Sequence, residues 1–374
     1  MADPLRIAVI GAGYWGPNLV RNFRASVDWD LVAVCDRDPD RARRVVGGRS
    51  TVAVLTDPAA LLARDDVDAV AVATPAATHA GIVLAALDAG KHVLVEKPVA
   101  ANGADARRMV ARAAEAGRVL MVDHTFCYTP VVRAIRDLVA DGSLGDLHFV
   151  DSVRINLGLV QPDVDVFWDL APHDLSILDF VVPGGLVPTG VAAQGGDPLG
   201  VGRSCVGYLT LPLAGGALAH LHVNWLSPTK IRQMVVGGSR RTLVWDDLAP
   251  QQRLTVYDRG VDPGEDLPDR AAARVSYRLG DAWAPALPER EALASVVDEF
   301  AAAIRGGRAP LTDGRAGLRV LDVLESASLS LSDGGRLVPV ARGDLVGAGA
   351  ADAAPAPGPG AGSRASAAAT GRRR

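Results

Sequence analysis

The sequence holds little cysteine and lysine, and it lacks long apolar runs. Cys35, Cys127 and Cys205 are odd in number and have no paired spacing, which argues against a disulfide scaffold or a zinc site and favours a reducing compartment. The sequence has no apolar run long enough to span a membrane, and its N-terminus lacks the basic-then-apolar pattern of a signal peptide, so we expect a cytoplasmic protein. The net charge of −4 gives no electrostatic footprint for nucleic acid.

Lysine is the scarcer of the two basic residue types. Of 39 lysine and arginine residues only three are lysines, namely Lys91, Lys97 and Lys230. This imbalance indicates a coding bias that replaces lysine wherever arginine will serve. A surviving lysine is either a chance survivor or a residue whose compact, titratable ammonium cannot be imitated by guanidinium.

The first third of the chain alternates short apolar runs with helical patterns. The expected strands are 5–10, 31–36, 67–75, 92–98 and 118–125, with helical segments ending near residue 23 and covering 79–90 and 104–117. This alternation predicts parallel βαβ units and a doubly wound α/β sheet over residues 1–125.

The pattern of expected helices and strands changes after residue 125. A helix at 130–140 leads into strand-like alternation, and the strand candidates between 187 and 257 are separated by turn residues. This pattern predicts an open, largely antiparallel mixed sheet in a second α/β domain at 126–345, with helices at 289–307 and 314–334. Residues 346–374 form an Ala/Gly/Pro-rich tail that we expect to be disordered.

A glycine-rich loop follows the first expected strand. Gly11, Gly13 and Gly16 match the dinucleotide-binding pattern, which permits a tight turn, a close approach to pyrophosphate and close helix packing. Asp36 ends the second strand, where an acid can hold the adenosine ribose hydroxyls and favours NAD. Arg37 beside it could accommodate the extra phosphate of NADP, so NADP is not excluded.

Glu96, Lys97 and Pro98 end the strand HVLVEKP. The carboxyl ends of parallel strands face the ligand crevice, so these side chains are expected where a nicotinamide would lie. Neighbours in an extended strand point to opposite faces, which disfavours a simple Glu96–Lys97 ion pair.

The stretch FWDLAPHDLS at 167–176 places Asp169 and His173 four residues apart, on one face of a helix. One interpretation is structural: Asp169 caps the helix, Pro172 lies in its first turn, and His173 is a packed histidine. The other is functional, with both side chains facing a substrate.

The motifs AVIGAGYWG, ATPAATH, VEKP and D-x-x-x-H resemble the glucose–fructose oxidoreductase/inositol dehydrogenase (Gfo/Idh/MocA) family over about residues 5–345. GYWGPNLVRNF, RINLG, FWDLAPHD and NWLSPTKIR are similar to its sugar-nucleotide 3-dehydrogenase branch. The resemblance implies a Rossmann domain, a second domain whose open sheet mediates homodimers or homotetramers, and a catalytic site of Lys97, Asp169 and His173.

This triad suits alcohol oxidation. His173 has an ordinary pKa near working pH, as a general base needs, and Lys97 can stabilise the developing alkoxide. Asp169 could orient the imidazole or hold a neighbouring hydroxyl. Whether Lys97 or His173 takes the proton stays open, and no metal is needed.

Further cofactor contacts follow from the resemblance, each with a packing alternative. They are Tyr14, Trp15, Thr74, Pro75, His79, Glu96 and Trp168.

Cations of the second domain could bind the phosphates of a sugar nucleotide. Arg154 with Asn156, and Lys230 with Arg232, alternate along expected strands, so each pair shares a face. The alternative is a solvated sheet face. Tyr128 and Gln161 are further candidate substrate contacts.

We therefore expect an NAD-dependent dehydrogenase that oxidises a secondary hydroxyl, at carbon 3, of a nucleotide-linked or glycosidic sugar, with a role in amino-sugar or antibiotic biosynthesis. The alternatives are an inositol or free-sugar dehydrogenase, an NADPH-dependent keto-sugar reductase, and a non-catalytic sensor that binds the same cofactor.

Overall fold

The computed structural model describes residues 3–48, 50–162, 164–262 and 276–340. The expected tail at 346–374 lies outside the described residues. Of the helices in the described ranges, none is long and apolar enough to cross a membrane.

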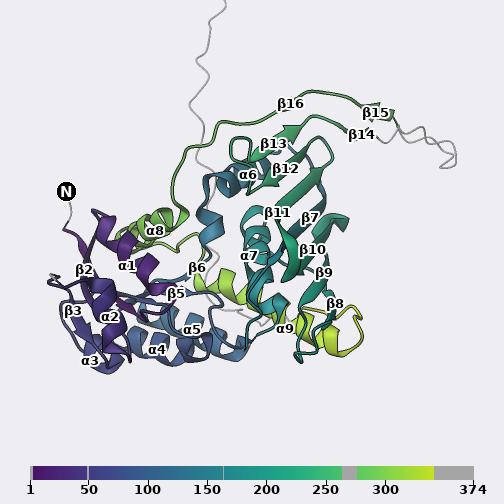
Figure 1. The fold of residues 1–374 in the computed structure, drawn as a ribbon. Coiled ribbons are helices and arrows are strands. Elements are labelled where there is room, and N and C mark those ends of the chain that lie inside the picture. The colour runs from purple at the N-terminus through teal and green to yellow at the C-terminus, as the bar shows by residue number, and fades with distance from the viewer. Residues whose placement is uncertain (1–2, 49, 163, 263–275, 341–374) are drawn as a thin grey trace, which may run out of the picture. The chain divides into compact units, whose positions relative to one another are not determined.

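The first sheet is fully parallel, as predicted, with the order β3-β2-β1-β4-β5-β6 (Figure 1). This is the strand order of a dinucleotide-binding Rossmann sheet. Its strands are β1 (Leu5–Ile10), β2 (Trp29–Cys35), β3 (Ala53–Leu55), β4 (Ala69–Val72), β5 (His92–Glu96) and β6 (Leu120–Asp123). The short β3 escaped the sequence analysis.

Both faces of this sheet are covered by helices, which explains why its strands are apolar throughout. Ile7 and Val9 face one layer, whereas Ala8 and Ile10 face the other. The first layer holds α1 (Gly16–Ala25) and α2 (Pro39–Val46), and the second holds α3 (Pro58–Leu62), α4 (Ala76–Asp88) and α5 (Gly103–Ala116).

Helix α8 (Ala292–Gly306), which the sequence analysis assigned to the second domain, packs on the first layer of the Rossmann sheet. The indole of Trp29 donates a 3.0 Å hydrogen bond to the carbonyl of Val297, and its ring stacks on Phe300 at 5.2 Å. The chain therefore returns to its first sheet after building the second, because the apolar face of α8 completes that core.

The second sheet is mixed, as predicted, with the order β16-β13-β12-β11-β7-β10-β9-β8. Within it β10 pairs with β7 in parallel, and the other pairs are antiparallel. Its strands are β7 (Leu147–Leu157), β8 (Ala192–Gly196), β9 (Val206–Pro212), β10 (Leu218–Asn224), β11 (Leu226–Gly238), β12 (Thr242–Asp246), β13 (Leu254–Tyr257) and β16 (Ala282–Trp283), and β14 (Gly260–Asp262) pairs separately with β15 (Ser276–Arg278).

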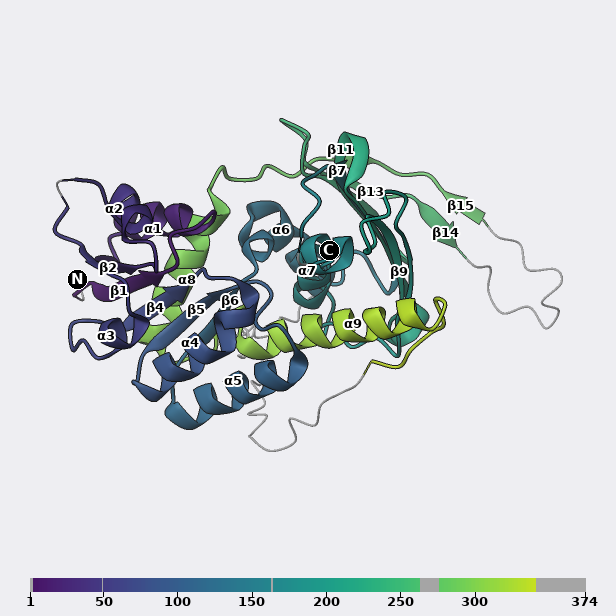
Figure 2. The same ribbon diagram turned by 60° about the horizontal axis from the view of Figure 1, so that its bottom comes forward.

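Helices α6 (Pro130–Ala140), α7 (Val166–Val181) and α9 (Gly314–Ser332) fill the space beside this sheet. Helix α9 contacts α5 and β6 of the Rossmann part, and also α7 and β8 of the second part (Figure 2). The short 3-10 helix η1 (Thr125–Tyr128) follows β6 and contacts α7. Helix α7 thus lies beside the segments that follow the Rossmann strands.

The start of α7 differs from the prediction. Its N-cap is Asp165, whose carboxylate accepts from the N–H groups of Phe167 and Trp168 at 3.0 Å. Asp169 lies in the first turn and Pro172 inside the helix. The prediction that Asp169 caps this helix was wrong because Asp165 satisfies the unpaired N–H groups one turn earlier, which leaves the Asp169 carboxylate available for other contacts.

Candidate active site

The glycine loop between β1 and α1 has the backbone of a pyrophosphate cradle. Gly11 has φ of +102°, and a Cβ there would lie 2.5 Å from the carbonyl oxygen of Ala73. A Cβ on Gly16 would lie 2.1 Å from the carbonyl oxygen of Gly11, whereas one on Gly13 would meet no described atom within 4 Å. Gly13 therefore leaves room for a ligand, at the N-terminus of α1.

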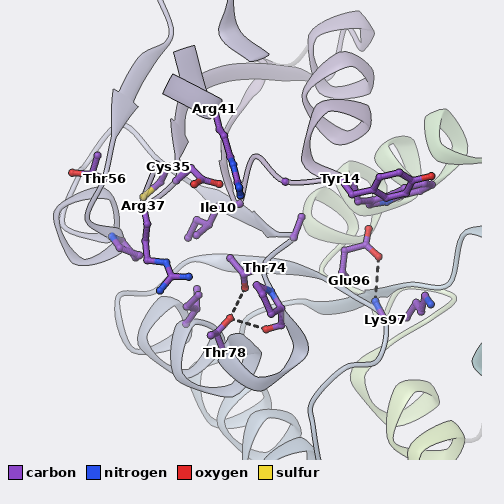
Figure 3. A pocket seen from close by; sticks show the side chains of 18 residues that line it. Ile10, Tyr14, Cys35, Arg37, Arg41, Thr56, Thr74, Thr78, Glu96 and Lys97 are labelled. Atoms are coloured by element: carbon purple, nitrogen blue, oxygen red, sulfur yellow. Dashed lines mark hydrogen bonds between the residues drawn. The ribbon is translucent and has the colours of Figure 1, made fainter. Parts of the chain in front are cut away.

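A cavity of about 530 Å³ opens over this loop and runs along the carboxyl ends of the Rossmann strands (Figure 3). Arg37 and Arg41 line one end, and Glu96 and Lys97 line the other. Asp36, the chain neighbour of Arg37, is also a lining residue. This arrangement brings together residues that the sequence placed in separate motifs. The adenosine half of a dinucleotide fits the first end and the nicotinamide half the second.

Asp36 is held by the backbone around it. Its carboxylate accepts from the N–H of Ala12 at 2.7 Å and from the N–H of Asp38 at 2.9 Å. Each carboxylate oxygen keeps acceptor capacity, so Asp36 can still bind ribose hydroxyls. Arg41, which the sequence analysis did not single out, lies beside it with Arg37.

Five of the contacts inferred from the resemblance line the cavity, namely Tyr14, Trp15, Thr74, Pro75 and Glu96. Tyr14 is 95% exposed, whereas Trp15 is half-buried and donates from its indole to Asp123. Thr74 and Thr78 share a hydrogen bond of 2.8 Å between their hydroxyls.

The lining of this cavity does not include His79 or Trp168. His79 is buried, and its two ring nitrogens lie 2.9 Å from the carbonyl of Pro98 and 2.8 Å from that of Thr74. It joins the segments that follow β4 and β5. The indole of Trp168 donates to the hydroxyl of Ser328 in α9, so this ring packs between α7 and α9.

Lys97 links the nicotinamide end of the cavity to α7. Its ammonium donates to the main-chain carbonyl of Asp169 at 3.1 Å and lies 3.8 Å from the Asp169 carboxylate. The same carboxylate accepts from the indole of Trp225 at 2.9 Å. Lys97 and Asp169 are therefore neighbours, although 72 residues separate them in sequence.

His173 lies one turn along α7 in a cationic environment. Burial, together with the positive charges of Lys97 and Arg154, lowers the pKa of His173 well below its usual range. The imidazole therefore stays neutral near pH 7, the form that can accept a proton, and its pKa lies below the value near working pH that we expected from the sequence. Phe126 of η1 holds it in an edge-on contact, with 5.2 Å between the ring centroids.

Two residues at the end of β6 belong to this site and were missed from sequence. Asp123 accepts from Trp15, and His124 is buried, with no hydrogen-bond partner at either ring nitrogen among the described residues. Burial lowers the pKa of His124 to about 4. The rule that placed Lys97 at the ligand crevice, applied to the strand end VDHT, would have found both residues.

The predicted substrate cations have different surroundings. Arg154 is 3% exposed and forms a two-point ion pair with Asp174, at 2.8 and 2.9 Å, while its guanidinium lies 4.4 Å from the ring centre of Phe126. Because Asp174 neutralises the charge of Arg154 in the interior, Arg154 supports the site through packing and does not offer a surface charge to phosphate. Arg232 lies over the same ring at 5.7 Å and pairs with Asp247 at 3.4 Å.

Tyr128 is a further correction, because it is 1% exposed and its hydroxyl bonds that of Thr312 at 2.8 Å. It is a core residue and has no surface to offer a substrate. Asn156 is half-buried on β7, and Gln161 accepts from Arg203 through its main-chain carbonyl. Lys230 is exposed, next to a register shift between Leu226 and Ile231 of β11.

The three lysines divide into distinct environments. Lys97 lies at the cavity, and Lys91 donates to the carbonyls of Arg64 and Val67, both at 2.8 Å. A compact ammonium suits both positions better than a planar guanidinium.

Known proteins share this architecture. The family model described as an oxidoreductase family with an NAD-binding Rossmann fold (GFO_IDH_MocA) matches residues 5–124, and the model of the GFO/IDH/MocA C-terminal domain matches residues 132–244. D-apiose dehydrogenase from Paraburkholderia graminis is 28% identical over 87% of this chain and 88% of its own length.

UDP-N-acetylglucosamine 3-dehydrogenase from Acidithiobacillus ferrooxidans is 28% identical over 85% of this chain and 94% of its own. A solved structure of that name superposes with a TM-score of 0.74 at 26% identity, covering 89% of this chain and 99% of the other. GenD2 from gentamicin A biosynthesis, solved in complex with NAD, gives a TM-score of 0.74 at 26% identity, covering 91% of this chain and 98% of the other. With both domain models matched in order on one chain, this protein belongs to the Gfo/Idh/MocA family of oxidoreductases with an NAD-binding Rossmann domain.

Proposed function

We propose that this protein oxidises a secondary hydroxyl, at carbon 3 of a nucleotide-linked or glycosidic sugar, to a ketone with NAD. One observation carries the proposal: Lys97, at the nicotinamide end of the cavity, contacts Asp169 of α7, one helical turn before His173, and its charge helps to keep that imidazole neutral. A non-catalytic sensor would have no need of an ammonium and a neutral imidazole at that place.

The bound nicotinamide supplies the hydride acceptor. Lys97 donates to the hydroxyl oxygen of the substrate and stabilises the negative charge that develops there. His173 accepts the hydroxyl proton, since its neutral form has a free lone pair. With Lys97 and Arg154 nearby, the protonated imidazole is disfavoured, so it passes the proton on to solvent after the hydride has left.

Asp169 positions Lys97 in this scheme. Its main-chain carbonyl and carboxylate both lie within reach of the ammonium, and Trp225 fixes the carboxylate. The remaining lone pairs of the Asp169 carboxylate can accept a hydrogen bond from a neighbouring hydroxyl of the sugar. This arrangement favours polyhydroxylated substrates over simple alcohols.

The relatives guide the choice of substrate. One is a sugar-nucleotide 3-dehydrogenase, one acts on D-apiose, and one belongs to the biosynthesis of an aminoglycoside. A 3-keto product suits later amination, so we place the reaction before a transamination step in amino-sugar or antibiotic biosynthesis. Arg232 and Lys230 are the proposed contacts for the phosphate or amino-sugar portion.

We further propose that the chain works as a homo-oligomer through the open face of its second sheet. Phe149, Tyr208 and Leu218 project from three adjacent strands of that face and are exposed. Exposed large apolar side chains on one face of a sheet are typical of a protein–protein contact. Sedimentation of the purified protein, compared with a Phe149→Glu/Leu218→Glu variant, tests this assignment.

The decisive experiment is a substrate panel of nucleotide sugars, inositols and aminoglycosides, with NAD and with NADP, followed by NADH absorbance and NMR of the product. We expect turnover with a nucleotide or glycosidic sugar and a ketone at carbon 3. Tight NAD binding without turnover of any substrate would favour the sensor. Turnover of inositols or free sugars alone would select the second enzyme function.

A Lys230→Ala variant tests the phosphate contact separately. We expect a higher KM for a nucleotide sugar and an unchanged kcat, because Lys230 of β11 is proposed to contact the phosphate or amino-sugar portion and takes no part in the chemical step. An unchanged KM would remove Lys230 from the substrate site.

A further inference from the structure

Two carboxyl groups meet at the nicotinamide end of the cavity. Glu96 ends β5 and Asp123 ends β6, and the two residues are register partners in the parallel pair of strands. Parallel register partners point to the same face of a sheet, so their carboxyl groups lie side by side. Glu96 lines the cavity directly.

The hydrogen bonds around this pair are unequal. Asp123 accepts from the indole of Trp15 at 3.2 Å and from the hydroxyl of Thr125 at 2.7 Å. Glu96 accepts only a long 3.3 Å bond from the N–H of Lys97, and its Oε1 is buried without a partner among the described residues. The surroundings therefore stabilise Asp123 as the anion and leave Glu96 poorly stabilised as one.

Asp123 is buried, whereas Glu96 is half-buried with a buried Oε1. Two neighbouring carboxyl groups in such a place do not both ionise easily. Burial, the negative charge of Asp123 and the hydrogen bond that a protonated Glu96 can donate to Asp123 raise the pKa of Glu96 well above its usual range, and the charge of Lys97 only partly opposes them. In the described part of the chain, Asp123 and Lys97 are the charged groups that act on Glu96. The pair thus carries one negative charge and one proton.

We propose that Glu96 and Asp123 share one proton beneath the nicotinamide ring and bind the oxidised cofactor in preference to the reduced one. The ring carries a positive charge in NAD⁺ and none in NADH. The charge of NAD⁺ favours ionisation of the second carboxyl, so NAD⁺ binding releases a fraction of a proton from Glu96 to solvent. NADH leaves that proton in place.

This role is independent of the sugar. It concerns the cofactor site alone, and Asp123 holds the negative charge of the pair. Because the histidines nearby, His124 and His173, have pKa values below 6.5, they are already neutral above that pH and release no proton. Proton release between pH 7 and 9 therefore reports on the carboxyl pair or on Lys97, and a Glu96 variant separates these two sources.

The test is calorimetric titration of the full protein with NAD⁺ and with NADH, without substrate, in two buffers of different ionisation enthalpy. The wild-type protein is expected to release a fraction of a proton with NAD⁺ and none with NADH. Glu96→Gln abolishes this release. Asp123→Asn raises the Kd for NAD⁺ about tenfold, as removal of one nearby charge predicts, and changes the Kd for NADH less than about twofold.

Asp88→Asn, which removes an exposed carboxylate on α4, is the matched control and retains the wild-type release. Equal proton release with NAD⁺ and NADH in the wild-type protein would overturn the proposal, as would an unchanged release in Glu96→Gln. The wild-type comparison needs no variant, so the proposal stays falsifiable if a substitution prevents cofactor binding. Failure of every sugar in the substrate panel would leave this result unaffected.

Discussion

The ammonium of Lys97 donates a 3.1 Å hydrogen bond to the main-chain carbonyl of Asp169 and lies 3.8 Å from its carboxylate. Lys97 follows a Rossmann strand, whereas Asp169 lies in the first turn of α7. The contact thus joins the cofactor cavity to the helix that carries His173. The proposed reaction centre is assembled from two parts of the chain that are far apart in sequence.

Replacing Lys97 by Met is expected to lower kcat by about 10²–10⁴, because the developing alkoxide loses its nearest positive charge. Asp169→Asn should cost less, since an amide oxygen can still accept from Trp225 and the main-chain carbonyl remains. Steady-state kinetics and NAD titration check both. His148→Gln, an exposed substitution on β7, serves as the control, and full activity of Lys97→Met would refute the mechanism.

His124 makes stability depend on pH. Its pKa falls from about 6.5 in the unfolded chain to about 4 in the folded protein, so the unfolded state binds the proton more readily between these values. The free energy of unfolding should therefore decrease as pH falls from 6.5 to 4, by about 3 kcal/mol from this residue alone. Urea unfolding at several pH values measures this dependence. Between pH 6.5 and 4 the free energy of unfolding of His124→Gln should fall less steeply with pH than that of the wild-type protein. Equal pH dependence in the two proteins would contradict the assignment.

Gly13 and Gly16 offer a matched pair of alanine substitutions. A Cβ at Gly13 meets no described atom within 4 Å, so Gly13→Ala should change the free energy of unfolding by less than about 0.5 kcal/mol while weakening NAD binding at least about tenfold. A Cβ at Gly16 lies 2.1 Å from the Gly11 carbonyl, so Gly16→Ala should cost about 1–3 kcal/mol. Equal losses of stability would show that the loop has no separate ligand space.

Asp36 should decide between NAD and NADP. Its carboxylate repels a 2′-phosphate, while Arg37 and Arg41 line the same end of the cavity. Asp36→Ser is expected to raise the Kd for NAD about tenfold and to lower that for NADP, as followed by fluorescence titration. A further Arg41→Ala substitution should reverse the gain for NADP. If the Asp36→Ser variant still prefers NAD, residues other than Asp36 determine the cofactor preference.

Arg154 and Asp174 form a buried ion pair, so removing one partner strands a charge in the interior. Arg154→Met is expected to cost about 3–5 kcal/mol of unfolding free energy, and Arg154→Met/Asp174→Leu should recover much of that loss. Thermal and denaturant unfolding measure both. A stable Arg154→Met protein with an elevated KM for nucleotide sugars would instead restore Arg154 as a substrate contact.

Much of the first part of the molecule follows from local pattern. Apolar runs that end in glycine or acidic residues predicted the parallel sheet, and the spacing of Gly11, Gly13 and Gly16 predicted the loop over the cavity. The lysine that ends β5 was found because strand ends in a parallel sheet share one edge. The change from helices to turns between strands likewise predicted the mixed second sheet.

Short-range rules failed where several residues could perform the same local task. Asp165 and Asp169 are both suitable helix caps, and only the structure selects the first. Arg154 and Arg232 have the same alternation in sequence, yet one is buried against Asp174 and the other is half-buried. Tyr128 and Trp168 appeared accessible because no sequence pattern reveals Thr312 or Ser328 as their partners.

The sequence by itself determined the α/β fold with its parallel and mixed sheets, the cofactor loop and the residue types of the proposed reaction centre, because periodicity and strand-end rules act over a few residues. The tertiary structure alone decided which of those side chains meet. It brought Lys97 to Asp169, paired Glu96 with Asp123, and surrounded His173 with cations. Charge and burial act through space, so the pKa values that set the chemistry exist only once the chain has folded.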